Sequence, residues 1–163
     1  MYFLIVEDDK SQFSYIKNGI RQGRYFSESR IERIATELEF IEKLESLATE
    51  KPDVILLDIM LRWTDPHPDM TLPPPHIAEA SFFRAGVRCE QRLAADSRTR
   101  NIPVIVYSIL DKKDFDGEIS ERPEVHYLEK DFGVEKLNSK LEECLLHNDS
   151  QPQMKITGFG VKS

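Results

Sequence analysis

Five side chains that could do chemistry stand at or just beyond the ends of apolar runs in this 163-residue chain. A carboxylate can act as a nucleophile or bind a hard cation, and a lysine or serine can bind the oxygens of an anion. Helix capping could explain one or two of these residues, but the whole set indicates one shared site. The residues are Glu7, Asp8, Asp58, Ser108 and Lys130.

The segment DVILLDIML, residues 53–61, shows the pattern most clearly. Its four apolar residues at 54–57 predict a buried strand, and Asp58 follows them directly. A buried charge is costly unless it is paired. Two explanations are open at this point. Either Asp58 is a cap or loop residue that faces water, or distant parts of the chain build a site around it.

Apolar runs of strand length alternate with stripes of helical spacing along the chain. This alternation predicts a parallel sheet that is covered by helices on both faces. Functional groups of such sheets collect beyond the carboxyl ends of the strands, so the five side chains should converge on one edge. The predicted strands are 2–6, 31–35, 54–57, 102–107 and 125–128, and the helical stripes are Phe13/Ile16/Ile20, Leu38/Ile41/Leu44 and Val134/Leu137/Leu141/Leu145.

Length and composition exclude several classes of protein. The length suits one domain with a full core, and the net charge of −7 disfavours a general nucleic-acid-binding surface. No apolar run approaches the roughly 18 residues that span a bilayer. We therefore expect no membrane and no direct nucleic-acid partner. The two cysteines, Cys89 and Cys144, give no disulfide or metal framework and favour a reducing cytoplasm.

Four segments, taken in order, resemble the receiver domain of bacterial two-component response regulators, over about residues 1–146. FLIVEDD (3–9) resembles the first strand with its acidic pair, and DVILLDIML resembles the phospho-acceptor strand. DSRTRNIPVIVYS (96–108) resembles the approach to the family's hydroxyl residue, and HYLEK (126–130) the last strand with its aromatic and lysine. The resemblance implies a flavodoxin-like α/β fold, a doubly wound five-stranded parallel sheet with five helices.

The resemblance also implies a role for each acid. Asp58 would be the phospho-acceptor, and Asp8 and Asp58 would bind Mg²⁺ together with the backbone carbonyl of Met60. Glu7 would contact the metal through a water molecule. This register leaves Asp9 as the cap of the next helix, although a shift of the acidic pair to Asp8 and Asp9 is a second possibility.

Three further roles follow from the resemblance. Lys130 would bind the phosphoryl oxygens, and Ser108 would donate a hydrogen bond to them and draw its loop inward. Tyr127 stands where the family has its switch aromatic, and its ring would turn inward when that loop moves. The other explanation for Tyr127 is an ordinary half-buried strand aromatic.

The largest departure from the family follows Asp58. The glycine that matches the family's helix-opening glycine is Gly86, 28 positions later, and the intervening segment, about 62–85, holds five prolines. We expect stiff, extended chain over or beside the mouth of the site, and IAEASFFRA (77–85) should lengthen the third helix at its start. The histidines and Asp69 of this segment have no known metal-ligand spacing, which favours a solvated loop.

Smaller features of note concern the other loops and the tail. Asp131 follows Lys130 where the family usually has a proline after a cis bond, which leaves the reach of Lys130 open. Ile109 follows Ser108 where the family prefers a small residue. The segment DKKDFDGEIS (111–120) predicts only a short helix, and the tail, 147–163, is too short for an output domain.

The sequence therefore favours a single-domain response regulator of the cytoplasm. It would take a phosphoryl group on Asp58 from a histidine kinase or a phosphotransfer protein and signal to a downstream protein by contact. Phosphorylation and dephosphorylation would be self-catalysed, so we do not expect a conventional enzyme. One alternative is a degenerate receiver that acts as an adaptor without phosphate. Another is a haloacid-dehalogenase-type phosphatase, but Met60 stands where that family has its second aspartate.

Overall fold

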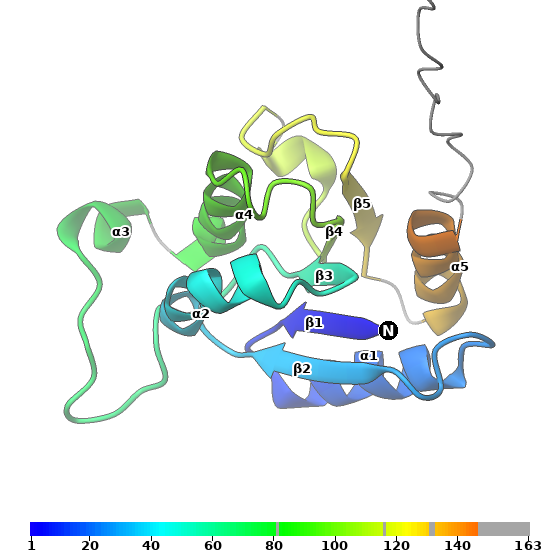
Figure 1. Cartoon of the computed structure of the whole chain (residues 1–163). Helices are drawn as coiled ribbons and strands as arrows, with labels where there is room; N and C mark the ends of the chain where they lie inside the picture. Colours follow the sequence, from blue (N-terminus) through cyan, green and yellow to red (C-terminus); the bar gives the residue numbers. More distant parts are fainter. Residues whose placement is uncertain (81, 116, 131–132, 147–163) are drawn as a thin grey trace, which may run out of the picture.

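The structure is a computed structural model that describes residues 1–80, 82–115, 117–130 and 133–146. Five parallel strands form one sheet in the order β2-β1-β3-β4-β5, so β2 and β5 are the edges (Figure 1). All five predicted strands are present, and the topology is the predicted flavodoxin-like one. The strands are β1 (Tyr2–Val6), β2 (Arg30–Ile34), β3 (Val54–Leu57), β4 (Val104–Ser108) and β5 (Val125–Glu129).

Helices cover both faces of the sheet, as the alternating pattern predicts. α2 and α4 pack against one face and α1 and α5 against the other, and each pair encloses its own apolar core. Successive residues of β1, such as Leu4 and Ile5, point into opposite cores, which is why the strand is apolar throughout. The helices are α1 (Lys10–Gln22), α2 (Glu37–Thr49), α3 (Pro75–Ala80), α4 (Ala85–Ala95) and α5 (Val134–Leu146).

The buried face of α2 differs from the predicted stripe. Phe40 and Leu47 are fully buried, whereas Leu38 and Ile41 are only half-buried. The two stripes share Leu44, and both have the spacing of three or four residues that is typical of a helix face, so periodicity alone does not distinguish them. Turning the helix to bury Phe40 removes the larger aromatic ring from water, which explains why this face was chosen.

The predicted cap at Asp9 is present, and Thr36 caps α2 in the same way. The Asp9 carboxylate accepts a hydrogen bond from the backbone N–H of Gln12 at 2.7 Å, and this bond holds the pKa of Asp9 below its usual value. The Thr36 hydroxyl accepts from the N–H of Glu39 at 3.2 Å, and the Glu39 carboxylate accepts in return from the N–H of Ala35 at 2.7 Å. Asp9 is thus engaged as a cap, which agrees with the acidic pair at positions 7 and 8.

The two longest connections depart from the simple alternation. The segment after β3 runs without a helix to residue 74 and then forms α3 and a 3₁₀ turn, η1 (Phe82–Arg84), before α4 begins at Ala85. The predicted helical stretch 77–85 is therefore helical in separate pieces and does not simply lengthen α4. α3 stands away from the sheet, beyond α2 and α4 (Figure 1).

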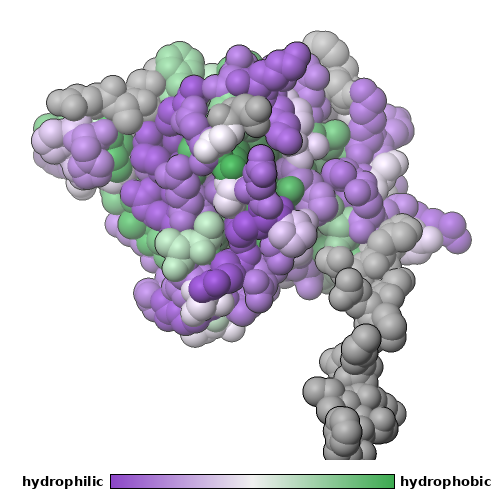
Figure 2. All heavy atoms as spheres, turned by 90° about the horizontal axis from the view of Figure 1, so that it is seen from above, coloured by the Kyte–Doolittle hydropathy of each residue, from purple (hydrophilic) through white to green (hydrophobic). Residues whose placement is uncertain are grey.

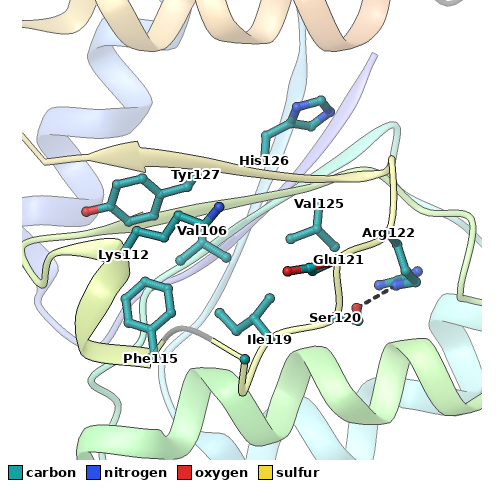
Figure 3. A pocket seen from close by; sticks show the side chains of 11 residues that line it. Val106, Lys112, Phe115, Ile119, Ser120, Glu121, Arg122, Val125, His126 and Tyr127 are labelled. Carbon is teal, nitrogen blue, oxygen red and sulfur yellow. Dashed lines mark hydrogen bonds between the residues drawn. The ribbon is translucent and has the colours of Figure 1, made fainter.

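The connection between β4 and β5 contains a short 3₁₀ turn, η2 (Lys112–Phe115), in place of a full helix, as its sequence predicts. Gly117 has a φ of 77°, which favours glycine and bends the chain back toward β5. A cavity of about 270 Å³ lies beside this turn, with Phe115 and Tyr127 among its apolar walls (Figure 3). The Arg122 guanidinium at its rim ion-pairs with the buried carboxylate of Glu90 in α4, at 2.7 Å.

The surface matches the charged composition. Seen from above, most of the visible face is hydrophilic, with small apolar patches (Figure 2). Among the residues that the structure describes, the most exposed large apolar side chains are Leu72 of the inserted segment and Ile109 after β4. Within the described ranges, no helix has both the length and the apolar character needed to cross a membrane.

Candidate functional site

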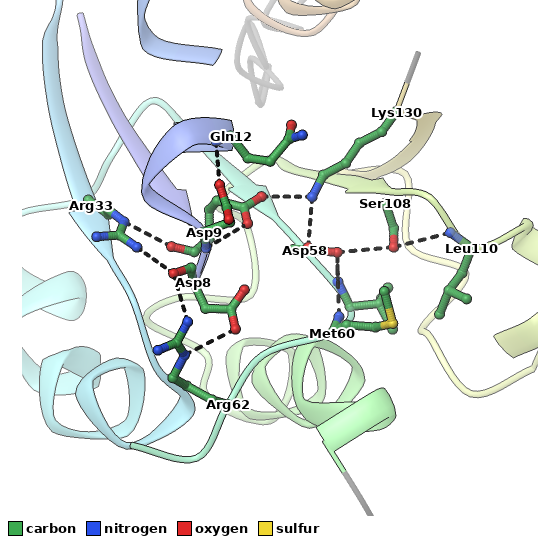
Figure 4. A network of polar contacts seen from close by, with 12 residues as sticks. Asp8, Asp9, Gln12, Arg33, Asp58, Met60, Arg62, Ser108, Leu110 and Lys130 are labelled. Atoms are coloured by element: carbon green, nitrogen blue, oxygen red, sulfur yellow. Dashed lines mark hydrogen bonds and ion pairs between the residues drawn. The ribbon is translucent and has the colours of Figure 1, made fainter. Parts of the chain in front are cut away.

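The predicted side chains converge at the carboxyl edge of the sheet (Figure 4). Asp58 follows the end of β3, Lys130 follows the end of β5, and Glu7 and Asp8 follow β1. These four residues line one cavity of about 530 Å³. Because the strands are parallel and adjacent, their carboxyl ends bring residues from distant parts of the sequence into contact.

Asp58 is buried, with 7% of the residue exposed, and both of its oxygens are paired. Oδ1 accepts hydrogen bonds from the N–H of Ile59 at 2.7 Å and from the hydroxyl of Ser108 at 3.0 Å. Oδ2 accepts from the ammonium group of Lys130 at 2.7 Å. The structure thus decides between the two explanations for this residue: Asp58 is not a solvated cap or loop residue, and other strands build a site around it.

Lys130 joins two buried carboxylates. Its ammonium group also lies 2.7 Å from Glu7 Oε2, and the side chains of Lys130, Glu7 and Asp58 are only 10%, 3% and 8% exposed. Burial alone would lower the pKa of Lys130, but Asp58 and Glu7 outweigh it and raise that pKa. Burial raises the pKa of Glu7, and Lys130 opposes this shift. Lys130 therefore stays charged and neutralises part of the negative charge of Glu7 and Asp58.

Gly86 fixes the position of the Asp58 backbone. The first turn of α4 passes so close to β3 that a Cβ on Gly86 would lie 2.1 Å from the carbonyl oxygen of Asp58. The N–H of Gly86 donates to the carbonyl of Ile59 at 2.9 Å. Only glycine permits this approach, and Gly86 therefore stands at the helix start beside Asp58, as the sequence predicts.

Two arginines that the sequence reasoning missed hold the acidic loop after β1. Arg33 donates to the backbone carbonyls of Glu7 and Asp8 at 2.9 and 2.8 Å. Arg62 Nε lies 3.2 Å from Asp8 Oδ2, and another of its nitrogens donates to the Asp8 carbonyl at 3.2 Å. Arg33 lies near the carboxyl end of β2, so the rule that identified the acids could also have identified this arginine.

The carboxylates are already paired with cations in this arrangement. Lys130 binds Asp58, and Arg62 binds Asp8, and no three acid, histidine or cysteine side chains in the described part of the chain are grouped as a ready metal site. The donor chemistry nevertheless fits Mg²⁺, which prefers hard oxygen ligands. Asp8, Asp58 and Met60 line the same cavity, so Met60, whose backbone carbonyl is the third predicted ligand, lies with the two acids.

Tyr127 links β5 to the loop after β4. It is half-buried, its hydroxyl donates to the carbonyl of Leu110, and its ring centroid lies 5.8 Å from that of Phe115. Ile109 is exposed at the mouth of the site cavity. These contacts agree with either explanation for Tyr127. Asp131 lies outside the described residues, and so does the peptide bond that joins it to Lys130.

The inserted segment, residues 62–85, starts in space beside the N-terminus of α2. The N–H groups of Glu37 and Leu38 in the first turn of that helix have no acceptor within the helix. They donate instead to the carbonyls of Arg62 and Trp63, each at 3.0 Å. The Trp63 indole donates to the carbonyl of Thr71 at 3.0 Å, which closes the segment on itself. No described residue of the insert lines the 530 Å³ cavity, although Arg62 contacts Asp8 at its edge, so the segment lies beside the site.

His67 and Asp69 of the insert, whose spacing favours a solvated loop over a metal site, lie in solvent. The side chains of His67 and Asp69 are 69% and 93% exposed, and His67 Nδ1 accepts a hydrogen bond from the N–H of Asp69. This arrangement agrees with a solvated loop. Glu37, at the start of α2, is a further buried acid that the sequence analysis did not single out. Its carboxylate is fully buried and forms two hydrogen bonds with Arg88, at 2.8 and 2.6 Å.

Comparisons by sequence give no relative, because no protein-family model and no curated protein matches the chain. Comparison by structure gives many. The phosphorylated cyanobacterial phytochrome response regulator RcpA superposes with a TM-score of 0.62 at 18% identity, over 93% of this chain and 98% of that one. The chain has the receiver-domain fold.

Two further receiver domains agree with this assignment. The receiver domain of the sensor histidine kinase PA1611 from Pseudomonas aeruginosa PAO1, with a magnesium ion in its active-site cleft, gives a TM-score of 0.60 at 18% identity, over 88% of this chain and 96% of that one. The receiver domain of the DNA-binding response regulator merR from Colwellia psychrerythraea 34H gives a TM-score of 0.60 at 20% identity, over the same shares. The likeness establishes the fold, and the chemistry has to be argued from the site.

Proposed function

We propose that this chain is a phospho-acceptor of two-component signalling, in which Asp58 takes a phosphoryl group from a histidine kinase or a histidine phosphotransfer protein. The observation that carries the proposal is the environment of Asp58. It is a buried carboxylate at the end of the central strand, and it is held by backbone N–H groups, the Ser108 hydroxyl and the Lys130 ammonium. This set orients a nucleophile and places positive charge beside it.

In the proposed step, an Asp58 oxygen forms a bond to the phosphorus of a phosphohistidine. The phosphorus–nitrogen bond breaks, its electron pair stays on the imidazole, and the product is an acyl phosphate on Asp58. Lys130 holds a positive charge beside the oxygens that gain charge. Ser108 can pass its hydrogen bond from the Asp58 carboxylate to a phosphoryl oxygen with a small movement, because it already lies 3.0 Å from Oδ1.

The charges of the site supply the argument for a cation. With all three groups ionised, Lys130, Glu7 and Asp58 carry a net charge of −1, and a phosphoryl group adds more negative charge. Bound Mg²⁺ would supply the missing positive charge. Asp8 and Asp58 would hold it with the carbonyl of Met60, and Glu7 would contact it through a water molecule.

The signal would leave through protein contacts on the side of β4 and β5. Movement of Ser108 toward a phosphoryl group pulls on the loop whose Leu110 carbonyl accepts the Tyr127 hydrogen bond. A shift of that loop changes the packing of Tyr127 against Phe115 and so changes the surface beside the 270 Å³ cavity. A histidine kinase or phosphotransfer protein upstream and a protein target downstream are the implied partners.

The test uses a small phosphodonor. The chain is incubated with acetyl phosphate and Mg²⁺, and its intact mass is measured for wild type, for Asp58→Asn and for the matched control Asp69→Asn, which alters a 93%-exposed carboxylate. We expect one phosphoryl adduct on wild type and on the control, and none on Asp58→Asn. An adduct that survives in Asp58→Asn, or no adduct on wild type, contradicts the proposal. Turnover of simple phosphomonoesters would instead favour the phosphatase alternative.

A further inference from the structure

The first residue of the inserted segment reaches into the acidic site. Arg62 lies four positions after Asp58, and its guanidinium contacts the carboxylate and the backbone carbonyl of Asp8, each at 3.2 Å (Figure 4). Asp8 is the acid that the proposed function assigns to the metal. The insert therefore supplies a positive charge to the very carboxylate that a cation would have to bind.

The backbone of Arg62 is anchored, so its position is set by the fold. Its carbonyl accepts the N–H of Glu37 at the start of α2, at 3.0 Å. Glu37 is itself fully buried, and Arg88 of α4 holds its carboxylate with two hydrogen bonds. The side chain of Arg62, by contrast, is 41% exposed and can turn. It already contacts Asp65, 3.3 Å away, which offers a second carboxylate within the insert.

A guanidinium and a divalent cation exclude each other at one carboxylate oxygen. Both need a short contact to that oxygen, and their positive charges repel across a few ångströms. We propose that Arg62 is a built-in competitor for the cation. It holds Asp8 while the metal is absent and turns to Asp65 when the metal binds, so the inserted segment sets the Mg²⁺ affinity of the site. This inference rests on the proposed function, because it takes Asp8 as a metal ligand.

The size of the effect follows from the exposure of the pair. An ion pair with a partly exposed arginine contributes little, so removing it should raise the Mg²⁺ affinity by up to about fivefold. The gain in Mg²⁺ affinity would come from the loss of the positive charge at position 62, and not from the loss of the arginine side chain as such. Arg62→Lys keeps the charge and should therefore stay within about twofold of wild type, whereas Arg62→Gln should bind Mg²⁺ more tightly.

The experiment is a titration with MgCl₂ at constant low ionic strength, followed by calorimetry and by the fluorescence of Trp63, the only tryptophan of the chain. The variants are Arg62→Gln and Arg62→Lys. The matched control is Arg98→Gln, because Arg98 is half exposed and also pairs with two acids, but it lies away from the site. Thermal unfolding checks that each variant folds.

We expect Arg62→Gln alone to bind Mg²⁺ more tightly and to lose most of the Mg²⁺-dependent change in Trp63 fluorescence. Equal or weaker affinity in Arg62→Gln overturns the competitor role, and so does a gain of the same size in Arg98→Gln or in Arg62→Lys. If acetyl phosphate modifies Asp58 while Arg62→Gln leaves the Mg²⁺ affinity unchanged, the inference fails and the proposed function stands. If Mg²⁺ binds more tightly to Arg62→Gln but no adduct forms, the proposed function fails and the competition stands.

Discussion

Replacing Lys130 by methionine tests whether the site is held together by one buried cation. The ammonium group lies 2.7 Å from both Glu7 and Asp58, and all three side chains are at most 10% exposed. Lys130→Met leaves two carboxylates buried without a counter-charge. Removing one partner of a buried pair costs about 3–5 kcal/mol of unfolding free energy, and we expect a loss in that range at neutral pH.

The loss should shrink as the pH falls. Burial already raises the pKa of Glu7 above its ordinary value of 4.5, and loss of Lys130 raises it further. An acid whose pKa is higher in the folded state binds more protons folded than unfolded, so stability falls as the pH rises through that interval. Lys130→Met should therefore recover relative to wild type on acidification from pH 7 toward 4.5.

Urea unfolding at neutral and at acidic pH measures both effects. The matched control is Lys140→Met, because Lys140 pairs with Glu143 on the surface of α5, where such a pair contributes less than about 1 kcal/mol. Adding Glu7→Gln to Lys130→Met removes one of the two stranded charges and should restore part of the lost stability. The reasoning is refuted if Lys130→Met loses no more than Lys140→Met, or if its loss grows on acidification.

Two further predictions concern the surroundings of Asp58. Gly86→Ala places a Cβ 2.1 Å from the Asp58 carbonyl oxygen and should lower the free energy of unfolding, measured with urea, by about 3 kcal/mol. Gly117→Ala meets no neighbouring atom and reports only the backbone cost of an alanine at a φ of 77°. Ser108→Ala removes a hydroxyl that lies 3.0 Å from Asp58 Oδ1 and should slow modification by acetyl phosphate about tenfold or more, while Ser108→Thr keeps the hydroxyl and most of the rate.

The fold could be predicted from the sequence because its signals are local. The strands β1, β3 and β4 are short apolar runs, whereas the edge strands β2 and β5 mix apolar and polar residues. The caps at Asp9 and Thr36 are patterns of four residues. The buried face of α2 could not be predicted, because the stripes through Leu38 and through Phe40 both have helical spacing. The sequence also predicted a short helix after β4 but could not show that a cavity would result.

The acids, the hydroxyl and the lysine of the site could be predicted because each lies at the end of a strand, and parallel strands bring such ends together. The partners of those groups could not. Arg62 contacts Asp8 across 54 positions, and Arg88 contacts Glu37 across 51, so nothing in the local sequence pairs them. From sequence alone, a charged residue in a helix or loop is expected to face solvent. Only the folded structure distinguishes a buried ion pair from a surface charge.

The central claim is that Asp58 is the acceptor of a phosphoryl group, and the most direct measurement locates the modification. The chain is treated with acetyl phosphate and Mg²⁺ and then with sodium borohydride, which reduces an acyl phosphate to the alcohol and so converts the aspartate to homoserine. Peptide mass spectrometry then reads the modified position. We predict homoserine at position 58 alone. Homoserine at Asp8 or Asp9, the corresponding alcohol at Glu7, or an unmodified Asp58 under conditions that modify the chain elsewhere, would contradict the account.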